Sequence, residues 1–150
     1  MRTSDFEIIE YSDNYKYQIL SVWEKSVLAT HDFLKKEDFI EIKALVHSID
    51  LNDFQVFCLL NEKRVLGFIG VAEKKVEMLF IDPACIGEGL GKKLLNFAIL
   101  ELNANLVDVN EQNTNAFKFY QKLGFEVYEK TDRDEQGREY PLLRMRLIGT

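Results

Sequence analysis

The chain has 150 residues, of which 47% are hydrophobic, and a formal net charge of −6 with a pI near 5.0. This length and composition suit a single domain, 1–150, with one core, and the acidic balance disfavours a broad basic surface for nucleic acid. No apolar run approaches the roughly 20 residues of a membrane span, and the polar N-terminus lacks a signal-peptide core, so we expect a cytoplasmic protein with no membrane partner.

Hydrophobic periodicity predicts the following elements, taken in chain order. The first part of the chain gives a strand at 6–11, helices at 15–27 and 34–49, and strands at 55–60, 65–73 and 76–81. The rest gives a helix at 91–102, a strand at 106–109, a helix at 115–123, a strand at 125–128, a polar loop at 131–139 and a strand at 142–147. A short loop at 61–64 and a tight turn at Lys74-Lys75 join the middle strands.

The connections between these elements predict the fold class. The strand at 76–81, the helix at 91–102 and the strand at 106–109 form a right-handed parallel unit, whereas the strands before it are antiparallel. We therefore predict an α/β fold: a mixed, mainly antiparallel sheet with a central parallel strand-helix-strand unit and flanking helices.

A glycine-rich turn links the strand at 76–81 to the helix at 91–102. It contains Gly87, Gly89 and Gly91. The first backbone amides of a helix have no intrahelical acceptor, and glycines let a phosphate approach them without a Cβ in the way. The turn therefore predicts a pyrophosphate site and a nucleotide-like cofactor.

Two other phosphate-binding loops also place glycines at a helix start. A P-loop, G-x-x-x-x-G-K-S/T, would need a glycine at Ile86 and a hydroxyl at Lys93, so phosphoryl transfer is disfavoured. A dinucleotide-binding loop needs G-x-G-x-x-G and an acidic residue about twenty positions on, whereas the spacing here is G-x-G-x-G with Asp108 near that distance. A dinucleotide-dependent oxidoreductase is therefore an alternative, although little chain remains after Asp108 for further βα units.

Two motifs resemble those of the GNAT superfamily of N-acetyltransferases. The first, Q/R-x-x-G-x-G/A, aligns with residues 86–91, and the second, N-x-x-A-x-x-F/L-Y-x-x-x-G-F, aligns with residues 113–125. Residues 23–34 and 140–143 are similar to a bacterial subgroup of small GNAT acetyltransferases. The resemblance covers nearly the whole chain. It implies the acyl-CoA N-acyltransferase fold and transfer of an acetyl group from acetyl-CoA to a primary amine by direct attack in a ternary complex.

The resemblance also implies where acetyl-CoA, the co-substrate, binds. The implied contacts are Leu79, Phe80 and Ile81 for the pantetheine arm, Ile86, Gly87, Glu88, Gly89, Leu90, Gly91 and Lys92 for the pyrophosphate, and Asn113, Ala116, Phe119 and Tyr120 from the second motif. Ile86 stands where the family has Arg or Gln, so a charge-assisted contact is missing, and a non-catalytic acyl-CoA-binding module is a second alternative. Lys92 or Lys93 can supply positive charge instead. No metal is expected.

Tyr120 matches the family's tyrosine that protonates, or orients toward, the leaving thiolate. Asn113 and Tyr120 are seven residues apart on a predicted helix, so they share a face with the small Ala116 between them. The alternative interpretation is a core aromatic side chain beside Phe119 and Leu123.

Three residues are candidates for the base that accepts the amine proton. Asp108 stands at a strand end, and Glu77 lies on the preceding strand at a position used as a base in relatives. His31, with Phe33, lies in the connection between the first two helices, which shapes the acceptor pocket in the family, and histidine titrates in the useful range. The alternatives are solvated charges for the two acids, capping or packing for His31, and a water relay in place of any side chain.

The remaining features leave partner and assembly open. Cys58 and Cys85 lack C-x-x-C spacing, so we expect reduced free thiols. The acceptor is a small-molecule or protein amine that the sequence does not name. A homodimer is compatible with the sequence and is not determined by it.

Overall fold

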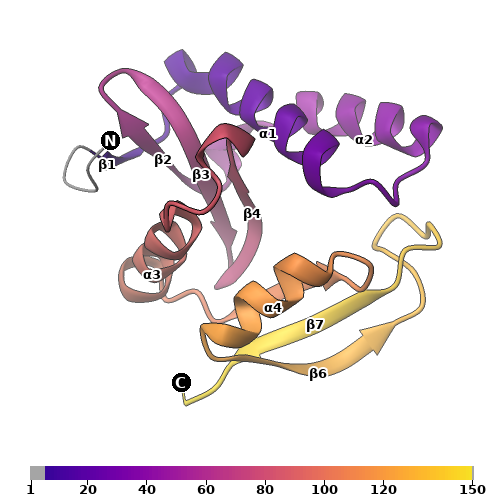
Figure 1. The fold of residues 1–150 in the computed structure, drawn as a ribbon. Helices are drawn as coiled ribbons and strands as arrows, with labels where there is room; N and C mark the ends of the chain where they lie inside the picture. The colour runs from indigo at the N-terminus through magenta and orange to yellow at the C-terminus, as the bar shows by residue number, and fades with distance from the viewer. Residues whose placement is uncertain (1–5, 150) are drawn as a thin grey trace.

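The computed structural model describes residues 6–149 and contains a seven-stranded sheet of order β1-β2-β3-β4-β5-β7-β6 (Figure 1). The strands are β1 (Phe6–Glu10), β2 (Gln55–Asn61), β3 (Arg64–Ala72), β4 (Lys75–Ile81), β5 (Leu106–Asn110), β6 (Phe125–Thr131) and β7 (Leu142–Leu147). Neighbouring strands are antiparallel, except that β4 and β5 are parallel and are joined through α3 (Leu90–Leu102). The predicted mixed sheet with a central parallel unit is confirmed.

Helices cover both faces of the sheet (Figure 1). On one face, α1 (Lys16–Thr30) and α2 (Lys36–Ser48) enclose a core that includes Ile19, Trp23 and Phe68. On the other face, α3 and α4 (Thr114–Lys122) enclose a core that includes Leu94 and Met145. Strands β1 to β4 contribute side chains to both cores, as the alternation of a pleated strand allows, whereas β5, β6 and β7 contribute only to the core under α3 and α4. Within residues 6–149, the 3₁₀ turns Asp13–Tyr15, Leu51–Asp53 and Pro83–Cys85 complete the connections.

Several predicted boundaries differ from the structure, among them the end of α1, which continues to Thr30 beyond the predicted 27. The turn between β3 and β4 lies at Glu73-Lys74, with φ values of 50° and 69°, and Lys75 already belongs to the strand. Two left-handed residues form the hairpin turn that matches the twist of the flanking strands. The β6 strand continues to Thr131 beyond the predicted 125–128, because backbone pairing with β7 holds an edge strand whose side chains are mostly polar and exposed.

Strand β4 bulges at Glu77 and then separates from β5. Gly70 pairs with Met78 and Val71 pairs with Val76, so Glu77 has no partner residue on β3. A bulge bends a strand and increases its twist. The parallel ladder between β4 and β5 consists of two residue pairs, Lys75 with Leu106 and Val76 with Val107. The remainder of β4, residues 78–81, therefore has an edge that β5 does not pair with.

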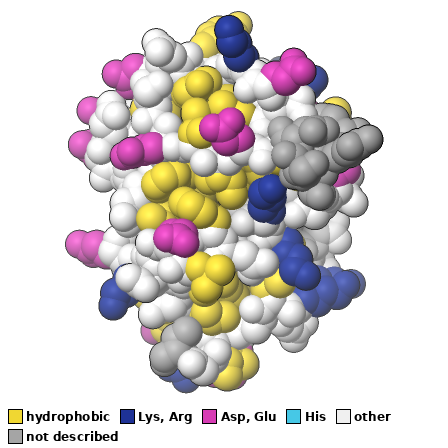
Figure 2. All heavy atoms as spheres, turned by 90° about the vertical axis from the view of Figure 1, so that its left-hand side faces the viewer, with side chains coloured by type: hydrophobic (Ala, Val, Ile, Leu, Met, Phe, Trp, Pro, Cys, Tyr) yellow, Lys and Arg dark blue, Asp and Glu magenta, His cyan; other side chains and the backbone are white. Residues whose placement is uncertain are grey.

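Exposed apolar side chains are distributed over several elements of the fold. The large exposed hydrophobic side chains come from α1, α2, α3, β6, the glycine loop and the C-terminal segment: Tyr17, Leu28, Ile40, Leu45, Ile86, Leu100, Val127, Tyr128 and Ile148. On the face drawn in Figure 2, apolar side chains form a band interrupted by acidic ones. A homodimer therefore remains a prediction. Among the helices of residues 6–149, none is long and apolar enough to cross a membrane.

Candidate active site

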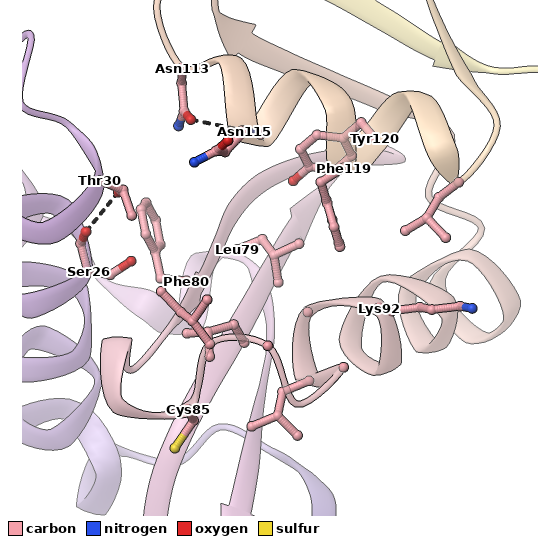
Figure 3. Close-up of a pocket in the computed structure, with 18 of the residues that line it drawn as sticks. Ser26, Thr30, Leu79, Phe80, Cys85, Lys92, Asn113, Asn115, Phe119 and Tyr120 are labelled. Atoms are coloured by element: carbon pink, nitrogen blue, oxygen red, sulfur yellow. Dashed lines mark hydrogen bonds between the residues drawn. The ribbon is translucent and has the colours of Figure 1, made fainter.

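Two adjoining cavities open where β4 and β5 separate. The larger has a volume of about 580 Å³ and lies between β4, the glycine loop, α3, α4 and the end of α1 (Figure 3). The smaller has a volume of about 130 Å³ and lies between β4 and β5. Six residues line both cavities: His31, Leu79, Phe80, Asn113, Ala116 and Tyr120. This shared wall is called the junction below.

Every residue predicted to contact the cofactor lines the larger cavity, with the exception of Glu88. Glu88 is exposed beside the cavity instead. Ser26 and Thr30 on α1 also line the cavity, as do Cys85, Asn115 and Lys122. We did not predict these five, although Ser26 and Thr30 fall inside the segment 23–34 that resembles the family.

The glycine loop has the geometry of a phosphate site. Gly87 and Gly89 have φ values of +92° and +77°, and a Cβ added to either would meet no atom within 4 Å. The first helical hydrogen bond of α3 is donated by Lys93 N to Gly89 O, at 3.1 Å. The amides of Leu90, Gly91 and Lys92 precede it, and so lack an intrahelical acceptor. The loop therefore fits a pyrophosphate group.

The structure distinguishes the two lysines that follow the loop. Lys92 lines the larger cavity, whereas the Lys93 ammonium lies 5.8 Å from the ring centroid of Phe6, on the other side of α3. Lys122, near the end of α4, adds a second cation to the cavity wall. Ile86 is 59% exposed at the rim, so its side chain supplies no charge and little packing.

Asp82 anchors the start of the glycine loop. Its buried carboxylate pairs with Lys25 at 3.2 Å and Arg64 at 3.4 Å, and accepts the Ala84 amide hydrogen bond at 3.0 Å. Burial acts to raise the pKa of Asp82, but the Ala84 hydrogen bond and the two cations outweigh it, so the pKa is lowered. The anchor ties α1 and β3 to the start of the glycine loop.

Tyr120 is both a packed aromatic side chain and a junction residue. Its ring contacts Phe119 and Phe125 edge-on, with centroids 5.1 and 5.6 Å away, while Tyr120 lines both cavities. Figure 3 shows Phe119 and Tyr120 extending from α4 toward Leu79 on β4. Burial raises the pKa of Tyr120, so the phenol stays protonated. The two interpretations of Tyr120 are compatible.

Asn113 and His31 meet at the junction from opposite sides. Asn113 Oδ1 caps α4 by accepting a hydrogen bond from Ala116 N at 3.1 Å, and its Nδ2 lies 3.5 Å from His31 Nε2. His31 also ends α1, where its backbone amide donates to Val27 O. Phe33 lines neither cavity and packs behind His31, with ring centroids 5.3 Å apart.

The two candidate acids share the smaller cavity. Asp108 forms an ion pair with Lys75, with Oδ2 and Nζ 2.5 Å apart, and its side chain is only 13% exposed. Glu77 keeps contact with solvent, but partial desolvation in the cavity raises its pKa, assisted by Glu135 and Asp108 and opposed by Lys75. Asp108 is therefore not a solvated strand-end charge. Within residues 6–149, no group of three or more His, Cys, Asp or Glu side chains is arranged to hold a metal ion.

Comparison with known proteins agrees with this geometry. The family model described as an acetyltransferase (GNAT) domain matches residues 14–148. The peptidyl-lysine N-acetyltransferase YjaB of Escherichia coli is 36% identical over 133 residues, which cover 88% of this chain and 90% of that protein. The solution structure of apo-form YjaB from Escherichia coli superposes with a TM-score of 0.87 at 34% identity, covering 97% of this chain and 99% of that one.

A more distant structure shows the same fold. It is the PaiA N-acetyltransferase of Thermoplasma acidophilum in complex with coenzyme A, with a TM-score of 0.67, 22% identity, and coverage of 94% of this chain and 98% of that one. The match to the family model and the identity to YjaB, each over most of the chain, show that this protein belongs to the GNAT family and is an N-acetyltransferase.

Proposed function

We propose that this chain transfers the acetyl group of acetyl-CoA to the side-chain amine of a protein lysine, by direct attack within a ternary complex. The observation that carries the proposal is the junction, where a large, mainly apolar cleft that begins at the glycine loop meets a small cavity that contains two acids. The names of the YjaB relatives support lysine as the acceptor. We treat residues 1–150 as one catalytic domain and keep the prediction of a cytoplasmic location.

The cofactor half of the proposal rests on the glycine loop and the free edge of β4. The open backbone at Gly87 and Gly89 suits the pyrophosphate, and the unpaired backbone of residues 78–81 offers hydrogen bonds to an extended amide-containing arm. Acetyl-CoA supplies the activated acyl group when bound. Lys92 and Lys122 offset part of the phosphate charge.

The acceptor half rests on Glu77 and Asp108. A cavity of about 130 Å³ is narrow, which suits the unbranched end of a lysine side chain better than a bulky amine. Its two carboxyl groups favour the positively charged form in which a lysine arrives. Because Lys75 neutralises Asp108, we assign the exposed Glu77 as the main electrostatic contact to the acceptor and Asp108 as the residue that fixes Lys75 beside it.

Tyr120 is proposed to serve the leaving group. The amine nitrogen forms a bond to the carbonyl carbon, the carbon–sulfur bond breaks, and the sulfur needs a hydrogen-bond or proton donor. The Tyr120 hydroxyl is protonated and lies at the junction, between the two cavities.

A free-thiol release assay with acetyl-CoA and a panel of amines tests the proposal. We expect turnover with a lysine-containing peptide and less with a peptide in which arginine replaces the lysine. Cofactor binding without thiol release for any amine would favour the non-catalytic acyl-CoA-binding module. Stabilisation by NAD(H) and not by acetyl-CoA would favour the dinucleotide-dependent oxidoreductase instead.

A further inference from the structure

We infer that His31 accepts the proton that the acceptor amine loses, at Nε2, and that the Thr30 hydroxyl holds His31 in the tautomer that leaves this nitrogen free. The inference rests on the proposed acetyl transfer. It goes beyond that proposal by choosing one base among three candidates and by naming a positioning residue that the motifs do not include.

Location is the first argument. The reacting carbon and nitrogen must meet where the cofactor cavity and the acceptor cavity join. Of the six junction residues, His31 and Tyr120 are the two with side chains that titrate. Glu77 and Asp108 line only the smaller cavity, and Asp108 is already bonded to the Lys75 ammonium.

The hydrogen bonds of Thr30 fix the tautomer of His31. The Thr30 hydroxyl donates to the Ser26 carbonyl oxygen at 2.7 Å, a bond drawn in Figure 3. Its oxygen also lies 2.7 Å from His31 Nδ1. A hydroxyl has one hydrogen to donate, so in the second contact the oxygen accepts and Nδ1 carries the proton. In the neutral imidazole, Nε2 then holds a lone pair.

The contact with Asn113, on the other side of the ring, also indicates that His31 Nε2 is unprotonated. Its Oδ1 is used by the Ala116 amide at the start of α4, which places the Nδ2 amide group toward His31 Nε2, 3.5 Å away. An amide NH₂ group can only donate, so an unprotonated Nε2 suits this neighbour. The long separation leaves Nε2 weakly bound and available to an incoming amine.

Burial keeps the imidazole neutral near pH 7, against the opposing effect of the acidic groups around it. Burial lowers the pKa of His31, and Asp32 opposes this effect. From the other elements, Glu77 on β4, Asp108 on β5 and the Tyr120 phenol on α4 line the same cavity as the ring. A neutral imidazole is the form that can accept a proton.

The proposed step balances without any further reactant. The lysine ammonium first loses one proton to solvent, which leaves the neutral amine. As the amine nitrogen bonds to the acetyl carbon, its acidity rises, and its proton moves to His31 Nε2. The carbon–sulfur bond breaks, and the thiolate takes a proton from Tyr120. The imidazolium then returns one proton to the phenolate through solvent, which yields an amide, a free thiol and the starting enzyme.

The kinetic test compares the two histidines of the chain. His47 is exposed on α2, so His47→Gln is the matched control for His31→Gln. Above pH 7, we expect His31→Gln to lower kcat/KM about 10²-fold or more, the usual range for a positioned base, and His47→Gln to leave it unchanged. The ratio of wild-type to His31→Gln kcat/KM, in which the ionisation of the acceptor cancels, should fall toward one as the pH drops below the pKa of His31. A ratio that stays constant with pH would overturn the assignment.

Thr30 variants test the positioning role separately. Thr30→Val removes the hydroxyl at nearly constant volume, and we expect a loss of tenfold or more in kcat with little change in the KM for the amine. Thr30→Ser keeps the hydroxyl and should restore the rate. Equal activity of the valine and serine variants would refute the role of Thr30.

An NMR measurement separates this inference from the proposed function. The ¹⁵N shifts of the two imidazoles, assigned with His47→Gln, report which nitrogen is protonated without any turnover. We expect protonated Nδ1 and unprotonated Nε2 in His31 at pH 7, and loss of this preference in Thr30→Val. The opposite tautomer would overturn the inference even if lysine acetylation is observed. Absence of turnover in the wild type with the expected tautomer would instead count against the proposed function alone.

Discussion

Replacing Ile86 by arginine should tighten the binding of acetyl-CoA. Ile86 stands at the rim of the larger cavity, where the GNAT motif has an arginine or glutamine, and its neighbours Gly87 and Gly89 leave the loop backbone open. A guanidinium group there can donate charge-assisted hydrogen bonds to the pyrophosphate.

The magnitude follows from the exposure of this position. A hydrogen bond to a charged group contributes about 1.5–3 kcal/mol when it is shielded from solvent, and an exposed ion pair contributes less than about 1 kcal/mol. Ile86 is 59% exposed, so solvent screens part of the interaction, and we take about 1 kcal/mol. This corresponds to a Kd about fivefold lower.

Isothermal titration with acetyl-CoA, at about 0.05 M and about 1 M salt, measures the effect. Ile40→Arg is the matched control, because Ile40 lies on α2, is 60% exposed, lines neither cavity and gives the same change in net charge. The gain for Ile86→Arg should shrink at high salt, where the screening length is about 3 Å. Equal tightening by both variants would assign the effect to net charge. No tightening by Ile86→Arg would mean that Lys92 and Lys122 already satisfy the pyrophosphate.

Three further predictions concern the loop, the leaving group and the anchor. Gly89→Val should abolish the rise in Tm that acetyl-CoA produces. Gly137→Val is the control, because Gly137 has a similar positive φ of 79° and open space around it, and this variant should keep the rise in Tm. Loss of the rise in both variants would point to a general fold defect. Tyr120→Phe should lower kcat about 10²-fold in the thiol assay with the Kd for acetyl-CoA nearly unchanged, and an unaltered kcat would remove Tyr120 from the chemistry. Asp82→Asn should lower the free energy of unfolding at pH 7 by about 1–2 kcal/mol, since its two cationic partners are largely exposed. The folded pKa of Asp82 is lowered, so this stabilisation is present above the unfolded pKa of about 3.9 and is lost as the pH falls through the folded pKa. The free energies of unfolding of wild type and variant, measured by chemical denaturation, should therefore converge at acidic pH.

Local patterns in the sequence were sufficient for the elements and for the cofactor loop. Helix and strand periods arise from neighbouring residues, so they are readable without tertiary contacts. The glycine loop is also local, since Gly87 and Gly89 adopt positive φ within one strand-to-helix turn. Errors at the turn before Lys75 and in β6 arose because pairing across the sheet, not side-chain polarity, sets those boundaries.

The chemistry of the site was decided by the tertiary structure. The β4–β5 ladder ends after two residue pairs, next to the unpaired bulge residue Glu77, and the cavities open there. A bulge depends on the pairing of two strands, so residue spacing along the chain does not predict it. Likewise, Asp108 resembles a free base in the sequence but meets Lys75, which is 33 positions earlier. His31 becomes a junction residue because Asn113 approaches it across 82 positions. The register between strands that are far apart in the sequence determines which polar groups pair with one another and which remain available for the reaction. The local sequence alone does not specify this register.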